Sequence, residues 1–184
     1  MRHVVLTGFM AVGKTAVGKR LARRLGRPFI DTDQLIEARE GMAISEIFDA
    51  RGEQEFRRVE REVVAELDPP GPAVIATGGG TFIDEGNREK LGRLGVVVCL
   101  VTSLETSVER ATRNSRRPLA AGDARERLER LYAERMPSYR RADILVETDG
   151  LTIEQSVARV LTMVEPRLKA PEPATGPVRQ DPSR

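Results

Sequence analysis

A phosphate-binding motif lies near the start of the chain. Residues 8–15 read GFMAVGKT and match the pattern G-x-x-x-x-G-K-[ST] at every fixed position. In such a loop the backbone N–H groups and the N-terminus of the next helix hold the phosphates of a nucleotide. Gly8 and Gly13 permit backbone angles and a close approach that a Cβ would block. We expect Lys14 to reach the transferring phosphate and the Thr15 hydroxyl to ligate Mg²⁺, so the motif predicts a nucleoside triphosphate site.

Two aspartates, Asp31 and Asp33, follow the second apolar run of the chain. Ligands of an open parallel sheet bind beyond the carboxyl ends of its strands, so both carboxylates are expected beside the phosphate-binding loop. One can then orient Mg²⁺ and its waters, while Asp33 accepts a proton from an attacking hydroxyl. The alternative is that Asp33 only caps the helix that follows. We favour the catalytic role, because a cap needs only one acid.

Three consecutive glycines, Gly78, Gly79 and Gly80, follow the third apolar run. Consecutive glycines cost backbone entropy on folding, so a plain loop rarely retains three of them. They let a substrate lie directly on the main chain and accept its N–H groups. A tight turn is the alternative, although turns rarely need more than one or two glycines. The run is therefore predicted to form the floor of an acceptor site.

Three arginines have surroundings that favour anion binding. Arg57 lies on a predicted helix with Glu60 one turn along, where the carboxylate can brace the guanidinium. Arg135 comes late on another predicted helix, and both arginines can offer fork-shaped pairs of donors to a carboxylate. The third, Arg116 or its neighbour Arg117, lies in a short segment between two helices, which is typical of a lid that closes over phosphates. Because arginine is abundant here, a solvated surface position is the alternative for each.

These residues need a scaffold, and apolar runs alternate along the chain with amphipathic helical patterns. The expected strands are His3–Thr7, Pro28–Ile30, Ala73–Ala76, Val96–Val101 and Ile144–Glu147. The expected helices are Thr15–Leu25, Gln34–Glu40, Ile44–Phe48, Glu53–Leu67, Asn87–Leu91, Leu104–Thr112, Asp123–Met136 and Ile153–Leu168. The alternation predicts an α/β protein with three layers, α/β/α, around a five-stranded parallel sheet.

The composition narrows the functional classes. The chain has 184 residues, 40% hydrophobic and 32% charged, which suits one globular domain over residues 1–168. Its net charge of +2 and its interleaved charges predict no nucleic-acid partner. It has no apolar run of the ~20 residues that span a membrane and no signal-peptide pattern, so we expect a cytoplasmic protein with no membrane partner. Cys99 and His3, the only cysteine and histidine, exclude internal disulfides, histidine-based triads and zinc clusters.

The composition changes after Pro166, where prolines fall among small and charged residues with almost nothing to bury. Residues 169–184 are therefore expected to form a disordered, proline-rich tail.

Taken together, these motifs resemble the shikimate kinase family, a small member of the P-loop kinases related to nucleoside monophosphate kinases. The resemblance covers about residues 4–161. It rests on the loop and on five further motifs in order, namely DTD at 31–33, GExxFRxxE at 52–60, GGG at 78–80, RPL at 117–119 and ERxPxYR at 134–140. It implies a P-loop NTPase fold with a substrate-binding segment at about 33–60 and a lid at about 112–123. It also implies a monomer that uses ATP to phosphorylate the 3-hydroxyl of shikimate, on the chorismate route to aromatic amino acids.

The resemblance assigns catalytic roles to Lys14, Asp33 and Arg117. Lys14 is expected to bind the phosphates, Asp33 to contact the reacting hydroxyl, and Arg117 to reach the phosphates from the lid. Mg²⁺ is expected on Thr15, with Asp31 assisting through water.

The resemblance also assigns the two binding sites. Arg57 and Arg135 are expected to hold the shikimate carboxylate, and Gly78 to Gly80 to line its ring, with Gly79 as the direct backbone contact. ATP is expected on the loop, with an arginine near adenine and another from the lid, a set that comprises Gly8, Met10, Ala11, Val12, Gly13, Lys14, Thr15, Ala16, Arg110 and Arg117.

The chain departs from the family pattern at three positions. Ala11 and Val12 stand where the family usually has glycine and a small residue, and Ala120 stands where leucine usually follows the RPL motif.

Two other functions remain as alternatives. Gluconate kinases share the loop but lack the glycine run and the Phe56-Arg57 string. A GTP-dependent switch needs an N-K-x-D motif, and this chain contains no Asn-Lys pair; its DARG at 49–52 fits D-x-x-G but follows a helical stretch.

Overall fold

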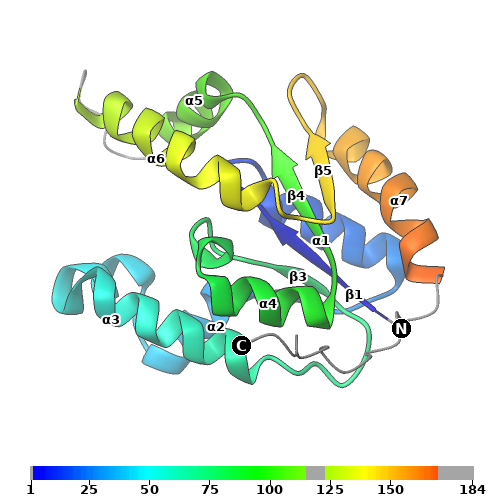
Figure 1. The fold of residues 1–184 in the computed structure, drawn as a ribbon, viewed down its shortest axis with the longest axis horizontal. Helices are drawn as coiled ribbons and strands as arrows, with labels where there is room; N and C mark the ends of the chain where they lie inside the picture. The colour runs from blue at the N-terminus through cyan, green and yellow to red at the C-terminus, as the bar shows by residue number, and fades with distance from the viewer. Residues whose placement is uncertain (1, 115–122, 170–184) are drawn as a thin grey trace, which may run out of the picture.

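The computed structural model describes residues 2–114 and 123–169 (Figure 1). Five strands form one sheet in the order β2-β3-β1-β4-β5, and every neighbouring pair is parallel. The strands are β1 (His3–Thr7), β2 (Phe29–Asp31), β3 (Val74–Ala76), β4 (Gly95–Val101) and β5 (Ile144–Glu147). The predicted five-stranded parallel sheet is confirmed. Two strands, β1 and β5, have the predicted bounds; β3 and β4 differ by one residue at their first position, and β2 is shifted by one residue at both ends.

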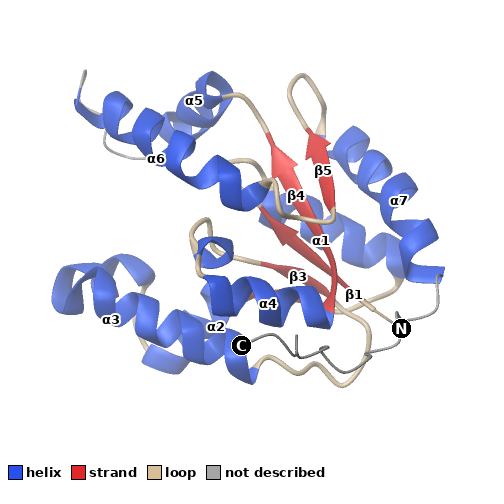
Figure 2. Ribbon diagram, viewed as in Figure 1, coloured by secondary structure: helices blue, strands red, loops and turns tan. Residues whose placement is uncertain are grey.

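Helices cover both faces of the sheet (Figure 2). On one face α1 (Lys14–Leu25) packs against α7 (Ile153–Lys169), and on the other α4 (Glu85–Leu94) lies against β1 and β4. Two helical pairs flank this arrangement, α2 (Thr32–Glu40) with α3 (Ile44–Glu66) and α5 (Leu104–Asn114) with α6 (Asp123–Tyr139). The layers are therefore α/β/α, as predicted. None of the described helices is both long enough and apolar enough to cross a bilayer.

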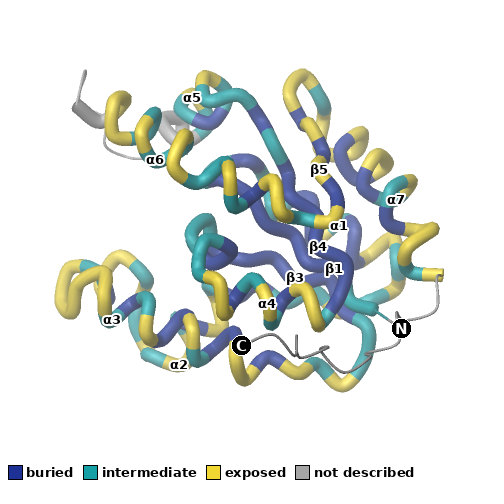
Figure 3. The backbone as a smooth tube through the Cα atoms, in the orientation of Figure 1, coloured by how far each residue is buried: buried dark blue, intermediate teal, exposed yellow. Residues whose placement is uncertain are grey.

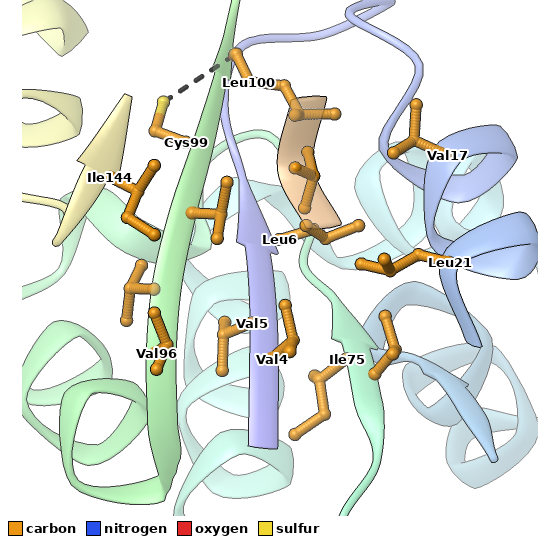
Figure 4. Close-up of a cluster of buried hydrophobic side chains, with 14 of the residues drawn as sticks. Val4, Val5, Leu6, Val17, Leu21, Ile75, Val96, Cys99, Leu100 and Ile144 are labelled. Carbon is orange, nitrogen blue, oxygen red and sulfur yellow. Dashed lines mark hydrogen bonds between the residues drawn. The ribbon is translucent and has the colours of Figure 1, made fainter. Parts of the chain in front are cut away.

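The central strand β1 fixes the core. Val4 pairs with Val74 on one side and Val96 on the other, and Val4, Val5 and Leu6 are fully buried. Figure 4 shows Leu6 of β1 facing Leu21 of α1. Strands that are buried on both faces carry continuous apolar runs. The runs VVL in β1 and VVVCL in β4 are such strands, and every residue in them is buried (Figure 3). The carboxyl ends of these strands then carry the chemistry-bearing residues.

Three local features differ from the sequence expectation. The two helices expected at 44–48 and 53–67 form one run, α3, interrupted only at Gly52, whose φ of 79° is not helical. Helix α6, expected to end at Met136, continues through Pro137 to Tyr139. Proline removes one bond to the preceding turn, but later residues can stay helical, and the Arg140 amide still donates to the Met136 carbonyl at 3.0 Å. A 3₁₀ turn, η1 (Thr81–Ile83), directly follows the glycine run and was not expected.

Candidate active site

The phosphate-binding loop joins β1 to α1 and needs unusual backbone angles. Gly8 has φ 135° and Gly13, the N-cap of α1, has φ 93°. A Cβ at Gly8 would overlap the Leu100 carbonyl oxygen, which confirms the need for glycine there. Ala11 also has a positive φ, 59°, although a side chain in this region costs roughly 1–2 kcal/mol. The loop retains the anion-binding backbone turn despite alanine at that position.

Lys14 lies inside this loop. Its ammonium donates to the carbonyl oxygens of Gly8 at 2.9 Å and Phe9 at 2.8 Å. Burial lowers the pKa of Lys14 to about 8, and the negative charge of Asp33 opposes that shift. The side chain is thus a desolvated cation held inside the loop by two carbonyl oxygens.

Asp31 connects the loop to α2. Its Oδ2 accepts a hydrogen bond from the Thr15 hydroxyl at 3.0 Å, and its Oδ1 accepts one from the Asp33 amide at 3.1 Å. The second bond makes Asp31 the N-cap of α2. The alternative in which Asp33 is the cap is therefore wrong. Thr15 and Asp31 together place two oxygen donors of the kind Mg²⁺ prefers at the mouth of the loop.

Asp33 does not cap α2, so its carboxylate can act on a substrate. Its Oδ1 is buried and has no hydrogen-bond partner among the described residues. Burial, followed by the negative charge of Asp31, raises the pKa of Asp33 to about 6, while Lys14 opposes the shift. An unpartnered carboxylate with a pKa near neutrality suits a group that accepts a proton.

The three glycines lie where three parts of the site meet. A Cβ added to Gly78 would lie 2.5 Å from Asp33 Oδ1, and one added to Gly79 would lie 3.5 Å from the Met10 amide nitrogen of the loop. One added to Gly80 would lie 2.5 Å from a guanidinium nitrogen of Arg57. Any side chain at Gly78 or Gly80 would therefore displace a predicted site residue, and the run is more than a tight turn.

The two predicted carboxylate-binding arginines line one cavity of about 390 Å³ between α3 and α6, which we call the acceptor cavity after its predicted role. Arg57 donates to Glu60 at 2.8 Å, which confirms the predicted brace, and the buried Glu60 also accepts from the Thr81 hydroxyl at 2.7 Å. Arg135 donates to the Gly79 carbonyl at 3.3 Å. The structure thus brings together two guanidinium groups that are 78 residues apart in the sequence (135 − 57).

A second cavity, of about 340 Å³, lies on the other side of the loop. Ala11, Val12, Gly13 and Arg110 line it together with residues of the β5–α7 connection. Arg110 therefore lies beside the loop, in a place that suits a nucleotide base. Arg117 and Ala120 lie outside the described residues, as do most of the predicted lid and tail.

The sequence analysis assigned no role to three residues that the structure places in the site. Arg61 lines the acceptor cavity, the Thr32 hydroxyl accepts from the Gly78 amide at 3.2 Å, and Tyr139 donates to the Gly79 carbonyl. Helical spacing could have indicated two of them. Arg61 follows Arg57 by four positions and Tyr139 follows Arg135 by four, so on a helix each lies on the same face as a predicted site residue.

A parallel sheet with a phosphate-binding loop after its central strand, and a separate acceptor cavity lined by arginines, defines the class of P-loop kinases that act on small molecules. The family model described as shikimate kinase matches residues 10–165. The chain belongs to the shikimate kinase family.

Individual relatives agree with this assignment. The chain is 41% identical to a shikimate kinase of Thermodesulfovibrio yellowstonii over 90% of its length and 96% of that protein. It is 45% identical to one of Symbiobacterium thermophilum, over 90% and 97%. Among solved structures, a shikimate kinase of Acinetobacter baumannii in complex with shikimate aligns with a TM-score of 0.83 at 35% identity, covering 92% of this chain and 96% of that one. A gluconokinase of Sinorhizobium meliloti, at 18% identity and a TM-score of 0.61, shares the fold alone.

Proposed function

We propose that the protein transfers the γ-phosphoryl group of ATP to the 3-hydroxyl of shikimate, giving shikimate 3-phosphate for the synthesis of chorismate and aromatic amino acids. The observation that carries this proposal is the position of the glycine run. The run lies beside Asp33, the phosphate-binding loop and Arg57, so an acceptor lying on it is within reach of all three. Membership of the shikimate kinase family supports the choice of acceptor.

The acceptor cavity fits a small carboxylate. Arg57 and Arg135 present two guanidinium groups, and each can offer a pair of parallel donors to a planar anion. Glu60 accepts a hydrogen bond from Arg57 and orders its side chain, so the Arg57 side chain loses little further entropy when the acceptor binds. A carboxylate held here leaves the hydroxylated ring over Gly78 to Gly80, toward Asp33.

The transfer itself depends on position and charge. We infer that Lys14 and the loop amides stabilise charge on the γ-phosphoryl group, that Arg117 assists from the lid, and that Asp33 accepts the proton of the attacking hydroxyl. Mg²⁺ bound with the nucleotide would neutralise phosphate charge, and the oxygens of Thr15 and Asp31, joined at 3.0 Å, would hold it directly and through water. Gly8, Met10, Ala16 and Arg110 would complete the nucleotide site.

Membership of the shikimate kinase family also supports a division of the chain into functional segments. We propose that residues 1–168 act as one kinase domain, with residues 33–60 as the substrate-binding segment and residues 112–123 as a lid. We also infer that the protein works as a monomer in the cytoplasm.

A coupled ADP-release assay tests the function. We expect ADP release with ATP and Mg²⁺ to depend on added shikimate, and ³¹P NMR of the product to show a phosphate ester at position 3. Gluconate in place of shikimate is expected to give no release above the ATP-only rate. Release that depends on gluconate would support the gluconate kinase alternative, and strong selectivity for GTP in calorimetry would support a switch protein.

The acceptor cavity gives a sharper prediction. Arg57→Lys keeps the positive charge but loses the fork of donors, so we expect KM for shikimate to rise about tenfold or more, with KM for ATP unchanged. The matched control is Arg58→Lys, on the next position of α3, where the side chain is half exposed and pairs with Glu55 and Glu62. Steady-state kinetics of both variants check this. If Arg57→Lys and Arg58→Lys had the same KM for shikimate, Arg57 would not bind the carboxylate.

A further inference from the structure

Tyr139 is a buried residue that the proposed reaction does not yet use. It ends α6 and is only 1% exposed. Its hydroxyl donates to the carbonyl oxygen of Gly79, which lies 60 positions earlier in the chain. Burial raises the pKa of Tyr139 to about 12, so the phenol keeps its proton and remains a donor throughout the neutral range.

The carbonyl groups of the glycine run are all engaged. The Gly78 oxygen accepts from the Thr81 amide at 3.4 Å, and the Gly80 oxygen accepts from the Ile83 amide at 3.0 Å. The Gly79 oxygen is not part of these turn contacts; within residues 2–114 and 123–169 it accepts from two side chains of α6, Tyr139 and Arg135.

The amide groups of the run behave differently. The Gly78 amide donates to the Thr32 hydroxyl at 3.2 Å, whereas none of the described residues accepts from the amides of Gly79 or Gly80. The run therefore keeps its carbonyl oxygens bound to the protein and leaves two N–H donors for an acceptor molecule.

We propose that Tyr139 is a positioning residue for acceptor binding: its hydroxyl fixes the Gly79–Gly80 peptide so that the run presents N–H donors, and not a carbonyl oxygen, to the anionic acceptor. The inference rests on the proposed function and concerns the same acceptor site.

A Gly-Gly peptide needs such a restraint. Glycine reaches nearly all backbone angles at low cost, so the planar unit between Gly79 and Gly80 can rotate as a whole with little steric resistance. Rotation would exchange the positions of an oxygen and an N–H group, and an oxygen facing a carboxylate repels it. Arg135 donates to the same Gly79 oxygen but is also proposed to bind the acceptor, so its guanidinium is shared. Tyr139 is buried and lies outside the cavity lining, so its hydrogen bond to the Gly79 oxygen can persist when the acceptor binds.

Tyr139→Phe tests this by deleting one oxygen atom and keeping the ring. We expect KM for shikimate to rise about three- to tenfold, as the loss of one neutral hydrogen bond predicts, with kcat and KM for ATP within about twofold of the wild type. The matched control is Tyr132→Phe, the same deletion at the other tyrosine of the chain, whose hydroxyl donates to Thr102 at 2.9 Å. That variant is expected to keep KM for shikimate within about twofold.

Amide NMR gives a second measurement that does not depend on turnover. We expect the ¹⁵N–¹H signals of Gly79 and Gly80 to be single and sharp in the wild type, and to be displaced, broadened or doubled in Tyr139→Phe but not in Tyr132→Phe. If the wild type releases no ADP with shikimate, the proposed function fails, yet these signals still test the restraint.

Other outcomes overturn the inference. A normal KM for shikimate with a lowered melting temperature would give the Tyr139 hydroxyl a purely structural role, and so would a variant that does not fold. Equal increases in KM for shikimate and ATP would also count against it, because the restraint acts on the acceptor side alone.

Discussion

Asp33→Asn is expected to lower kcat by about 10²- to 10⁴-fold, the range typical of a lost general base. The amide is nearly isosteric with the carboxylate but cannot accept the hydroxyl proton. In the wild type, kcat/KM should rise with pH through about 6 as Asp33 ionises, and fall above about 8 as Lys14 loses its proton. The rising limb should be absent from the variant.

The same substitution is expected to stabilise the fold. The pKa of Asp33 is about 6 in the folded protein against 3.8 for the free group, so the folded state binds this proton more tightly. Stability linked to Asp33 is therefore greatest in acid and is lost as the pH rises through about 6. At pH 8 the variant should gain on the order of 3 kcal/mol in free energy of unfolding, and at pH 4 much less.

Urea unfolding at the two pH values and steady-state kinetics measure both effects. Asp49→Asn is the control, because Asp49 is an exposed acid on α3 and its loss should change neither quantity. Near-normal turnover in Asp33→Asn would exclude the base role. Unchanged stability at pH 8 would show that the buried carboxylate has a polar partner in solution.

Lys14→Ala is expected to reduce kcat at least a hundredfold, which corresponds to on the order of 3 kcal/mol of transition-state stabilisation. The ammonium already lies within the loop, 2.9 and 2.8 Å from two of its carbonyl oxygens, so no large movement is needed to reach a bound phosphate. Alanine leaves the backbone amides of the loop in place, and nucleotide binding should therefore weaken less than turnover.

Turnover with saturating shikimate and ATP affinity by calorimetry separate these effects. Lys19→Ala removes an exposed lysine from the same helix and should leave both unchanged. If Lys14→Ala bound ATP and still turned over normally, the assignment of the phosphate-binding loop would be wrong.

The parts of the molecule that local sequence determines were predictable. The loop at 8–15 carries its own backbone requirements, and β1 and β5 have the expected bounds because their apolar runs end at polar residues or turns. The brace between Arg57 and Glu60 follows from helical spacing, and it is present.

Contacts between distant segments were not predictable. The Tyr139–Gly79 bond spans 60 positions and the Thr32–Gly78 bond spans 46, and no periodicity links such pairs. The role of Asp31 as cap was not predicted, because the helix was expected to begin at Gln34, which made Asp33 the candidate cap, and it begins at Thr32. The helix end predicted before Pro137 was wrong for a related reason: α6 continues to Tyr139, whose ring is buried in the core.

The only thiol of the protein lies on β4, fully shielded from solvent, and burial raises the pKa of Cys99 to about 12. Maleimide and iodoacetamide reagents, which need a thiolate, should therefore leave the native chain unmodified. A cysteine engineered at an exposed position of α3 and another on α6 could then carry a donor–acceptor dye pair without removing the natural residue. Energy transfer between the dyes would follow the two walls of the acceptor cavity in real time as each substrate arrives.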